Sequence, residues 1–112
     1  MPASAYEVRL TRGAEEDLEA IYDYLAAHRG MDDAEALLDR LLAKIGTLER
    51  FPLRGSVPKE LAPLGIREFL QILLPPYRLI YRVIGKTVFV ALIADGRRDM
   101  QALLARRLLG GE

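Results

Sequence analysis

Arginine side chains in the second half of the chain are the residues best placed to do chemistry. Arg78 and Arg82 lie four positions apart in an alternating stretch, so an extended strand would place them on one face. Arg97 and Arg98 follow the next apolar stretch, and Arg67 precedes the first. A guanidinium offers a planar fork of N–H donors that fits phosphate or carboxylate. The pattern predicts an anion-binding surface, and structural ion pairs with nearby carboxylates are the other interpretation.

Other candidate groups favour structural roles. Tyr77 and Tyr81 share a face of the same strand, where aromatic rings more often pack in a core than stack on bases. His28 is the only histidine and has no serine or cysteine partner in view, which disfavours nucleophilic catalysis. The acidic run within residues 15–19 is typical of a solvated helix face.

The composition excludes several classes of protein. The 112 residues contain no cysteine and one histidine, so we expect no disulfide and no metal site. No glycine-rich phosphate-binding motif is present, so we expect no cofactor. No apolar stretch approaches the ~18 residues of a membrane span, and the first residues do not resemble a secretory signal. These features predict a cytoplasmic protein.

The charged residues are unevenly distributed along a chain of zero net charge. Residues 1–53 carry six basic and eleven acidic side chains, whereas residues 54–112 carry ten basic and five acidic ones. Such a division predicts a molecule with one face of each sign. Dedicated nucleic-acid binders are usually basic throughout, with a pI above about 9. With a pI near 6.6, any contact with nucleic acid must be local and made by the second half.

The elements that position these side chains follow from the periodicity of apolar residues. Alternation predicts a short strand over residues 6–10. A helix follows, with Thr11 as its N-cap and Gly30 at its end. A second helix runs to residue 51, with a capping box at Asp32 and Glu35 and Met31 as a hydrophobic staple. The short connection predicts that the two helices pack antiparallel.

The second half of the chain predicts a loop, three strands and a last helix. Prolines and glycines favour a loop over residues 52–65. The strands cover residues 66–74, 77–84 and 87–94, and the last is apolar on both faces, as in the middle of a sheet. Asp99 caps a helix that extends to Leu109. The result is one α+β domain of residues 1–112, with its helices gathered on one face of a mostly antiparallel sheet.

Several segments together resemble the RelE/ParE family of toxins. They are Phe51–Gly55, Leu64–Glu68, Pro76–Arg82 and Ile93–Asp99. The opening strand and helical hairpin also match the layout of that family, so the resemblance covers nearly the whole chain. It implies a β-α-α-β-β-β-α fold. It also implies a small bacterial toxin of the cytosol, neutralised by a cognate antitoxin that wraps its functional surface.

The family has two activities, which differ in their chemistry. RelE-like members cleave messenger RNA on the ribosome, and they place basic residues on the first sheet strand and often a tyrosine near the C-terminus. Here those positions fall on Phe69, Gln71 and Leu104, none of which can usefully exchange a proton. Two arginines remain, Arg78 and Arg98. ParE-like members instead poison DNA gyrase without catalysing a reaction, and the turn that contains Arg98 looks more like that branch.

The resemblance therefore implies a ParE-like toxin that binds and poisons DNA gyrase. Its target-binding or antitoxin-binding residues would be Arg67, Arg78, Tyr81, Arg82, Arg97 and Arg98. One alternative is a RelE-like, ribosome-dependent mRNA endoribonuclease that uses Arg78 and Arg98. The other is an inert homologue that acts only as an antitoxin-binding module.

Overall fold

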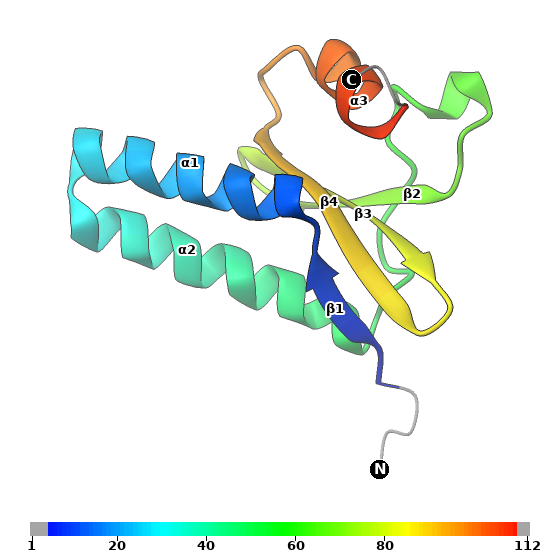
Figure 1. Ribbon diagram of the computed structural model, residues 1–112, viewed down its shortest axis with the longest axis horizontal. Coiled ribbons are helices and arrows are strands. Elements are labelled where there is room, and N and C mark those ends of the chain that lie inside the picture. The colour runs from blue at the N-terminus through cyan, green and yellow to red at the C-terminus, as the bar shows by residue number, and fades with distance from the viewer. Residues whose placement is uncertain (1–4, 110–112) are drawn as a thin grey trace.

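The computed structural model describes residues 5–109, which follow the order β1, α1, α2, β2, β3, β4, α3 (Figure 1). The bounds are β1 Glu7–Leu10, α1 Arg12–Arg29, α2 Met31–Gly46, β2 Phe69–Leu74, β3 Tyr77–Ile84, β4 Thr87–Asp95 and α3 Met100–Leu108. The predicted order of strands and helices is confirmed. Residues 1–4 and 110–112, the ends of the predicted domain, lie outside the described residues. No helix within residues 5–109 combines the length and apolar character needed to cross a membrane.

The strands form one sheet in the order β1-β4-β3-β2. β3 is antiparallel to both β2 and β4, which confirms the predicted three-stranded antiparallel sheet. β1 adds to its edge in parallel with β4, with Glu7 opposite Thr87 and Leu10 opposite Val90. β4 therefore has a neighbour on each side over its first half, as its two apolar faces predicted.

A β-bulge in β4 changes which side chains face the helical hairpin. The register with β3 shifts between Ile80 and Tyr81, which leaves Ala91 without a partner. Because an extra residue interrupts the two-residue alternation, Val90 and Ile93 face one side of the sheet and Leu92 faces the other.

Both faces of the sheet are covered, which corrects one expectation. α1 and α2 pack on one face in a core that includes Leu18, Leu41, Leu79 and Val88. α3 packs on the other face (Figure 1), where its buried residues are Met100, Leu103 and Leu104. The prediction that all helices gather on one face is thus wrong for α3. β3 and β4 carry apolar residues on both faces, and each face needs its own cover.

Local signals set the ends of most helices. Thr11 Oγ1 accepts a hydrogen bond from Ala14 N at 3.2 Å, which confirms the predicted N-cap of α1. Asp99 Oδ1 accepts from Ala102 N at 3.1 Å and caps α3 as predicted. α3 ends at Leu108, one residue before the predicted end.

The joint between α1 and α2 is tighter than predicted. Gly30 alone separates the helices, with φ at 101°, a conformation that favours glycine. α2 begins at Met31 and ends at Gly46, and its N-terminus has no side-chain cap. The predicted capping box at Asp32 and Glu35 is therefore wrong, because both residues already lie inside the helix.

The loop before β2 is longer than predicted, because β2 begins at Phe69 instead of residue 66. Ile66 N bonds back to Leu61 O at 3.2 Å, so this stretch turns instead of pairing with β3. Arg67 consequently lies ahead of the sheet. Further upstream, Ser56 pairs with Gln71 in both directions at 2.8 and 3.1 Å, which fixes the loop to the edge of β2.

Candidate functional site

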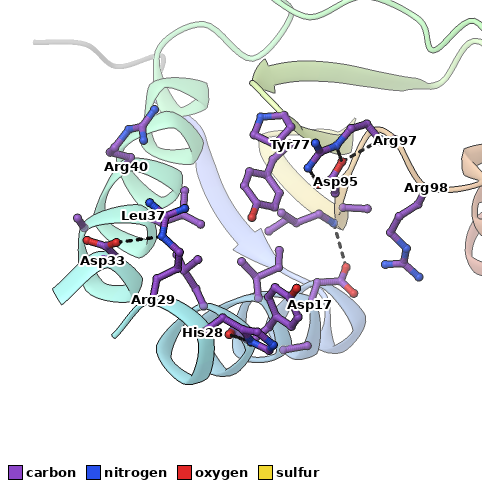
Figure 2. Close-up of a pocket in the computed structure, with 18 residues that line it drawn as sticks. Asp17, His28, Arg29, Asp33, Leu37, Arg40, Tyr77, Asp95, Arg97 and Arg98 are labelled. Atoms are coloured by element: carbon purple, nitrogen blue, oxygen red, sulfur yellow. Dashed lines mark hydrogen bonds and ion pairs between the residues drawn. The ribbon is translucent and has the colours of Figure 1, made fainter. Parts of the chain in front are cut away.

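A cleft of about 1030 Å³ separates the helical hairpin from the carboxyl end of β4 (Figure 2). Its apolar lining includes Ile21 and Leu25 of α1, Leu37 of α2 and Ile93 of β4. The amphipathic stripes of the two helices explain this lining, because the hairpin extends past the sheet and leaves part of its apolar face uncovered. An apolar surface of this kind suits a helical or extended segment of another protein.

Arginines line both sides of this cleft. Arg29 and Arg40 come from the hairpin, and Arg97 and Arg98 come from the turn between β4 and α3 (Figure 2). Arg29 Nε lies 3.4 Å from Asp33 Oδ2. Within residues 5–109, neither Arg40 nor Arg98 forms an ion pair. The cleft thus presents two unpaired guanidinium groups to whatever occupies it.

Arg97 is partly neutralised by Asp95. Its Nε and Nη2 lie 2.9 and 2.6 Å from the two carboxylate oxygens, and its backbone N–H also donates to Asp95 Oδ1. Hydrogen bonds from Arg97 lower the pKa of Asp95 to about 2, so this carboxylate is charged at neutral pH. Tyr77 points into the same cleft (Figure 2), and burial raises the pKa of its phenol.

Arg78 has a structural partner. Its terminal nitrogens donate to both oxygens of Glu60 at 2.9 and 2.7 Å, and its Nε donates to Gln71 Oε1 at 2.8 Å. Only 11% of either charged side chain is exposed. This hydrogen bonding from Arg78 holds the pKa of Glu60 below its ordinary value. The ion-pair interpretation holds for Arg78, with Glu60 as its partner.

Arg78 lies close to the turn after β4. A Cβ added at Gly96 would lie 2.8 Å from Arg78 Cδ, so the arginine stem passes directly over this glycine. The guanidinium then reaches Glu60, away from Arg97 and Arg98. Arg78 and the cleft arginines are therefore neighbours in space without forming one surface.

Tyr81 lies in the core, so its expected place on the contact surface is corrected. The residue is 0% exposed, and its hydroxyl accepts a hydrogen bond from Gly55 N at 3.1 Å. Burial raises the pKa of this phenol. Its position on the strand favoured core packing over base stacking, and the burial supports core packing. In this conformation Tyr81 fixes the loop before β2 and cannot touch a partner.

The remaining predicted arginines lie away from the cleft. Arg82 stacks on Phe69, with its guanidinium carbon 5.2 Å from the ring centroid, on the face that α3 covers. Arg67 is exposed just before β2. Of the six predicted site residues, the cleft thus brings together Arg97 and Arg98 only.

Asp17 is a site residue that the sequence did not reveal. It lines the cleft, and its carboxylate accepts from Ile93 N at 2.9 Å and from Arg107 at 2.6 and 3.1 Å. Arg107 also donates to Ala91 O at 3.0 Å. The acidic run was expected to be solvated, yet only 12% of the Asp17 side chain is exposed. No local pattern joins Asp17 to a partner 90 positions away.

Arg29 and Arg40 were also missed, although one signal could have found Arg40. Arg40 follows Leu37 by three positions, so it lies beside the apolar stripe of its helix. That spacing marks a cation at the rim of a buried face.

The positions that the resemblance assigns to RelE-type catalytic residues carry no group suited to proton transfer. Phe69 and Leu104 are buried in the core under α3, and Gln71 accepts a hydrogen bond from Arg78. Within residues 5–109, no group of three or more histidine, aspartate or glutamate side chains is placed to hold a metal ion.

Solved structures define the class of protein to which this fold belongs. A chain of the chromosomal ParDE toxin–antitoxin system of P. aeruginosa superposes with a TM-score of 0.69 at 22% identity, covering 83% of this chain and 98% of that one. A chain of the RelBE2 toxin–antitoxin complex of Mycobacterium tuberculosis superposes with a TM-score of 0.59 at 25% identity, covering 81% and 91%. The fold is that of proteins from toxin–antitoxin systems.

Sequence comparison gives the family. The family model described as "ParE toxin of type II toxin-antitoxin system, parDE" matches residues 8–100. Toxin ParE3 of Caulobacter vibrioides is 30% identical over 97 residues, which span 87% of this chain and 93% of that toxin. The chain therefore belongs to the ParE toxin family of type II toxin–antitoxin systems, as the resemblance implied.

Proposed function

We propose that this protein is a bacterial toxin that acts in the cytoplasm by binding and poisoning DNA gyrase, and that a cognate antitoxin neutralises it. The observation that carries the proposal is an apolar cleft with unpaired arginines at its rims, in a member of the ParE toxin family. The site lacks proton-transfer groups at the positions where RelE-like enzymes have them, which favours a binding mechanism over catalysis.

The antitoxin would occupy the arginine-rimmed cleft. The apolar lining favours the hydrophobic face of an amphipathic segment, and Arg40 and Arg98 favour carboxylates on its flanks. Guanidinium groups without protein partners can form charge-assisted hydrogen bonds with a ligand without first breaking an internal ion pair. Related toxin chains come from structures of toxin–antitoxin systems, which supports a protein partner of this kind.

The test for the antitoxin uses the protein encoded beside this gene. We expect tight binding by isothermal titration calorimetry, and we expect Arg98→Glu and Arg40→Glu each to weaken it tenfold or more, which corresponds to at least ~1.4 kcal/mol. Arg106→Glu is the matched control, because Arg106 is an exposed arginine outside the cleft lining. Equal affinities for all three variants would place the antitoxin elsewhere.

Poisoning of gyrase is tested separately with purified components. We expect the protein to reduce supercoiling of relaxed plasmid by purified DNA gyrase and to increase the amount of cleaved plasmid recovered after denaturation. Supercoiling that is unchanged at a tenfold molar excess of toxin, with no cleaved plasmid, would reject gyrase as the target. The antitoxin result would still stand in that case, because it concerns a different partner.

Cleavage of messenger RNA on the ribosome is the second candidate, favoured by the 25% identity to the RelBE2 chain. The geometry gives it less support, because Arg78 is paired with Glu60 and Leu104 is buried. We expect the message to remain intact in a cell-free translation reaction that contains the toxin. If the wild-type protein cleaves the message and Arg98→Ala does not, the enzymatic interpretation would hold instead.

A further inference from the structure

An unusual row of side chains crosses the sheet on the face opposite the helical hairpin. Arg9 of β1 pairs with Phe89 of β4, Phe89 pairs with Arg82 of β3, and Arg82 pairs with Phe69 of β2. We call these four residues the Arg–Phe row. Directly opposite residues in neighbouring strands have Cβ atoms about 4.5–5.5 Å apart, so the four side chains are neighbours across the sheet, and the Arg82 guanidinium lies over the Phe69 ring.

The cores on the two faces of the sheet establish the side on which the Arg–Phe row lies. Val8, Leu10, Val88 and Val90 pack against the hairpin, so Arg9 and Phe89 between them point to the other face. Phe69 belongs to the core under α3, and Arg82 stacks on its ring. The Arg–Phe row and the arginine-rimmed cleft are therefore on different sides of the molecule.

α3 covers only one end of this face. Its buried residues share a core with Phe69, Ile80 and Leu92, whereas Arg9 keeps 62% of its side chain exposed and its Nε donates to Glu7 Oε2 at 2.8 Å. In the next row of the sheet Ile84 is 51% exposed. Phe89 belongs to neither core cluster and is partly exposed. The end of the sheet near the β3–β4 turn thus presents aromatic and aliphatic surface beside two arginines.

Arg82 lacks an acceptor for its charge. Among residues 5–109 its Nε is a buried nitrogen with no hydrogen-bond partner, and no carboxylate forms an ion pair with its guanidinium. Contact with the Phe69 ring offsets part of the lost hydration, because an aromatic face attracts a cation. A buried N–H donor without an acceptor is destabilising, and the terminal nitrogens of this half-buried arginine carry a charge that a bound anion would neutralise.

We propose that the Arg–Phe row is a contact surface for single-stranded nucleic acid. Bases would stack on Phe89 and on the Arg82 plane, and Arg82 would hold a flanking phosphate. Arg9, whose Nε bonds to Glu7, would contribute its terminal nitrogens to a second phosphate. Aromatic side chains and arginine planes are the groups on which proteins stack unpaired bases, and cations beside them follow the backbone. The proposal does not depend on gyrase being the target.

The chemistry of the row favours nucleic acid over an acidic peptide. A peptide carboxylate would engage the arginines and leave Phe89 and Ile84 without a matching surface. A nucleotide supplies a π-face and a negative charge within one repeating unit, which matches the alternation of ring and guanidinium across β4 and β3. The neutral charge of the whole chain restricts such binding to this local patch.

The experiment measures the fluorescence anisotropy of a labelled twelve-nucleotide oligodeoxythymidylate titrated with the full chain at low salt. We expect saturable binding that weakens about fivefold or more in Phe89→Leu, which keeps apolar bulk and removes the ring. Arg82→Gln should weaken binding and reduce the slope of log affinity against log salt by about 0.7, the loss of one phosphate contact. Circular dichroism verifies that each variant is folded.

Three comparisons decide the result. Arg40→Gln makes the same charge change in the cleft, and we expect it to leave oligonucleotide affinity unchanged. A duplex of equal length and a polyglutamate peptide should both bind more weakly than the single strand. Failure to bind the oligonucleotide, equal weakening by Arg40→Gln, or tighter binding of the peptide would each overturn the proposal.

Discussion

The pair of Glu60 and Arg78 shows how a predicted binding residue becomes a structural one. Arg78 makes three hydrogen bonds, two to Glu60 and one to Gln71, and little of the pair is exposed. Removing one partner from such a pair leaves the other charge buried and costs about 3–5 kcal/mol. The pair therefore fixes the loop before β2 onto the sheet. We expect loss of Arg78 to act mainly by lowering the free energy of unfolding.

This pair gives a prediction about acid stability. The pKa of Glu60 is lowered from 4.5 in the folded state, chiefly by the hydrogen bond from Arg78. The resulting stabilisation is fully present above pH ~4.5 and is lost as the pH falls through the folded pKa. In urea melts between pH 3 and 7, we expect Glu60→Gln to be less stable at pH 7 and to lose less stability on acidification. Glu68→Gln, at an exposed carboxyl, should retain the wild-type profile.

Gly55 gives a second prediction at this scale. An added Cβ would lie 2.5 Å from Gln71 O and 2.8 Å from Tyr81 Oη, and the backbone oxygen cannot move without breaking the pairing with Ser56. We expect Gly55→Ala to lower the free energy of unfolding by ~2 kcal/mol or more.

The matched control is Gly46→Ala, where nothing lies within 4 Å and the backbone is helical. That change should be neutral or stabilise by up to ~1 kcal/mol. Chemical denaturation of both variants measures the two free energies of unfolding. Equal values would show that the loop backbone shifts at Gly55 and accommodates the added Cβ without loss of stability.

The residue types of the site could be predicted from the sequence, but their partners could not. Arginines in the second half of the chain indicated anion binding, and two of them, Arg97 and Arg98, do line the cleft. Nothing in the spacing paired Arg78 with Glu60, because they lie 18 positions apart across an irregular loop. Periodicity reports neighbours within one element, whereas this contact depends on how the loop folds back.

At the scale of elements, α3 depends on the rest of the molecule for its stability. It has nine residues, and isolated helices shorter than about 12–15 residues are marginal in water. Two things hold it in place. Its apolar side packs against the sheet, and Arg107 reaches Asp17 of α1 and Ala91 of β4. This link connects α3 to a residue that lines the arginine-rimmed cleft.

Loss of this link should loosen α3. We expect Arg107→Ala to increase amide hydrogen exchange across α3 and to lower global stability by ~1–3 kcal/mol, because Asp17 then stays mostly buried without its cation. Arg106→Ala is the control, since Arg106 is exposed. Hydrogen exchange measured by mass spectrometry makes the comparison. Identical protection of α3 in both variants would show that apolar packing alone holds the helix.

Elements that carry their own local signals were predicted well. Thr11, Gly30 and Asp99 each mark a helix end through a cap or a special backbone angle, and the two residues between β3 and β4 mark a hairpin. The side of the sheet that α3 covers has no such signal. The core under α3 includes Leu92 and Ala94, and the bulge at Ala91 sets the face on which these two residues lie once β3 is in register.

At the scale of the whole molecule, the cleft and the Arg–Phe row are separate surfaces. The sheet lies between them, and no residue belongs to both. We therefore expect a saturating antitoxin to leave the affinity for the oligonucleotide within about twofold. Anisotropy titrations with and without the antitoxin test this. The contrary result is that the antitoxin displaces the oligonucleotide, and that Arg98→Glu, which weakens antitoxin binding, also reduces this displacement. That result would show that the antitoxin covers both sides of the sheet.

The parallel pairing of β1 with β4 has a consequence for synthesis of the chain. Glu7 meets Thr87, so the first strand has no partner until 80 more residues have been made. At about 5–20 residues per second this interval lasts roughly 4–16 seconds. The α1–α2 hairpin can form early from local contacts, yet its apolar side is uncovered until the sheet arrives. A growing chain therefore exposes the hairpin half of the cleft before the strands that complete the cleft have been made.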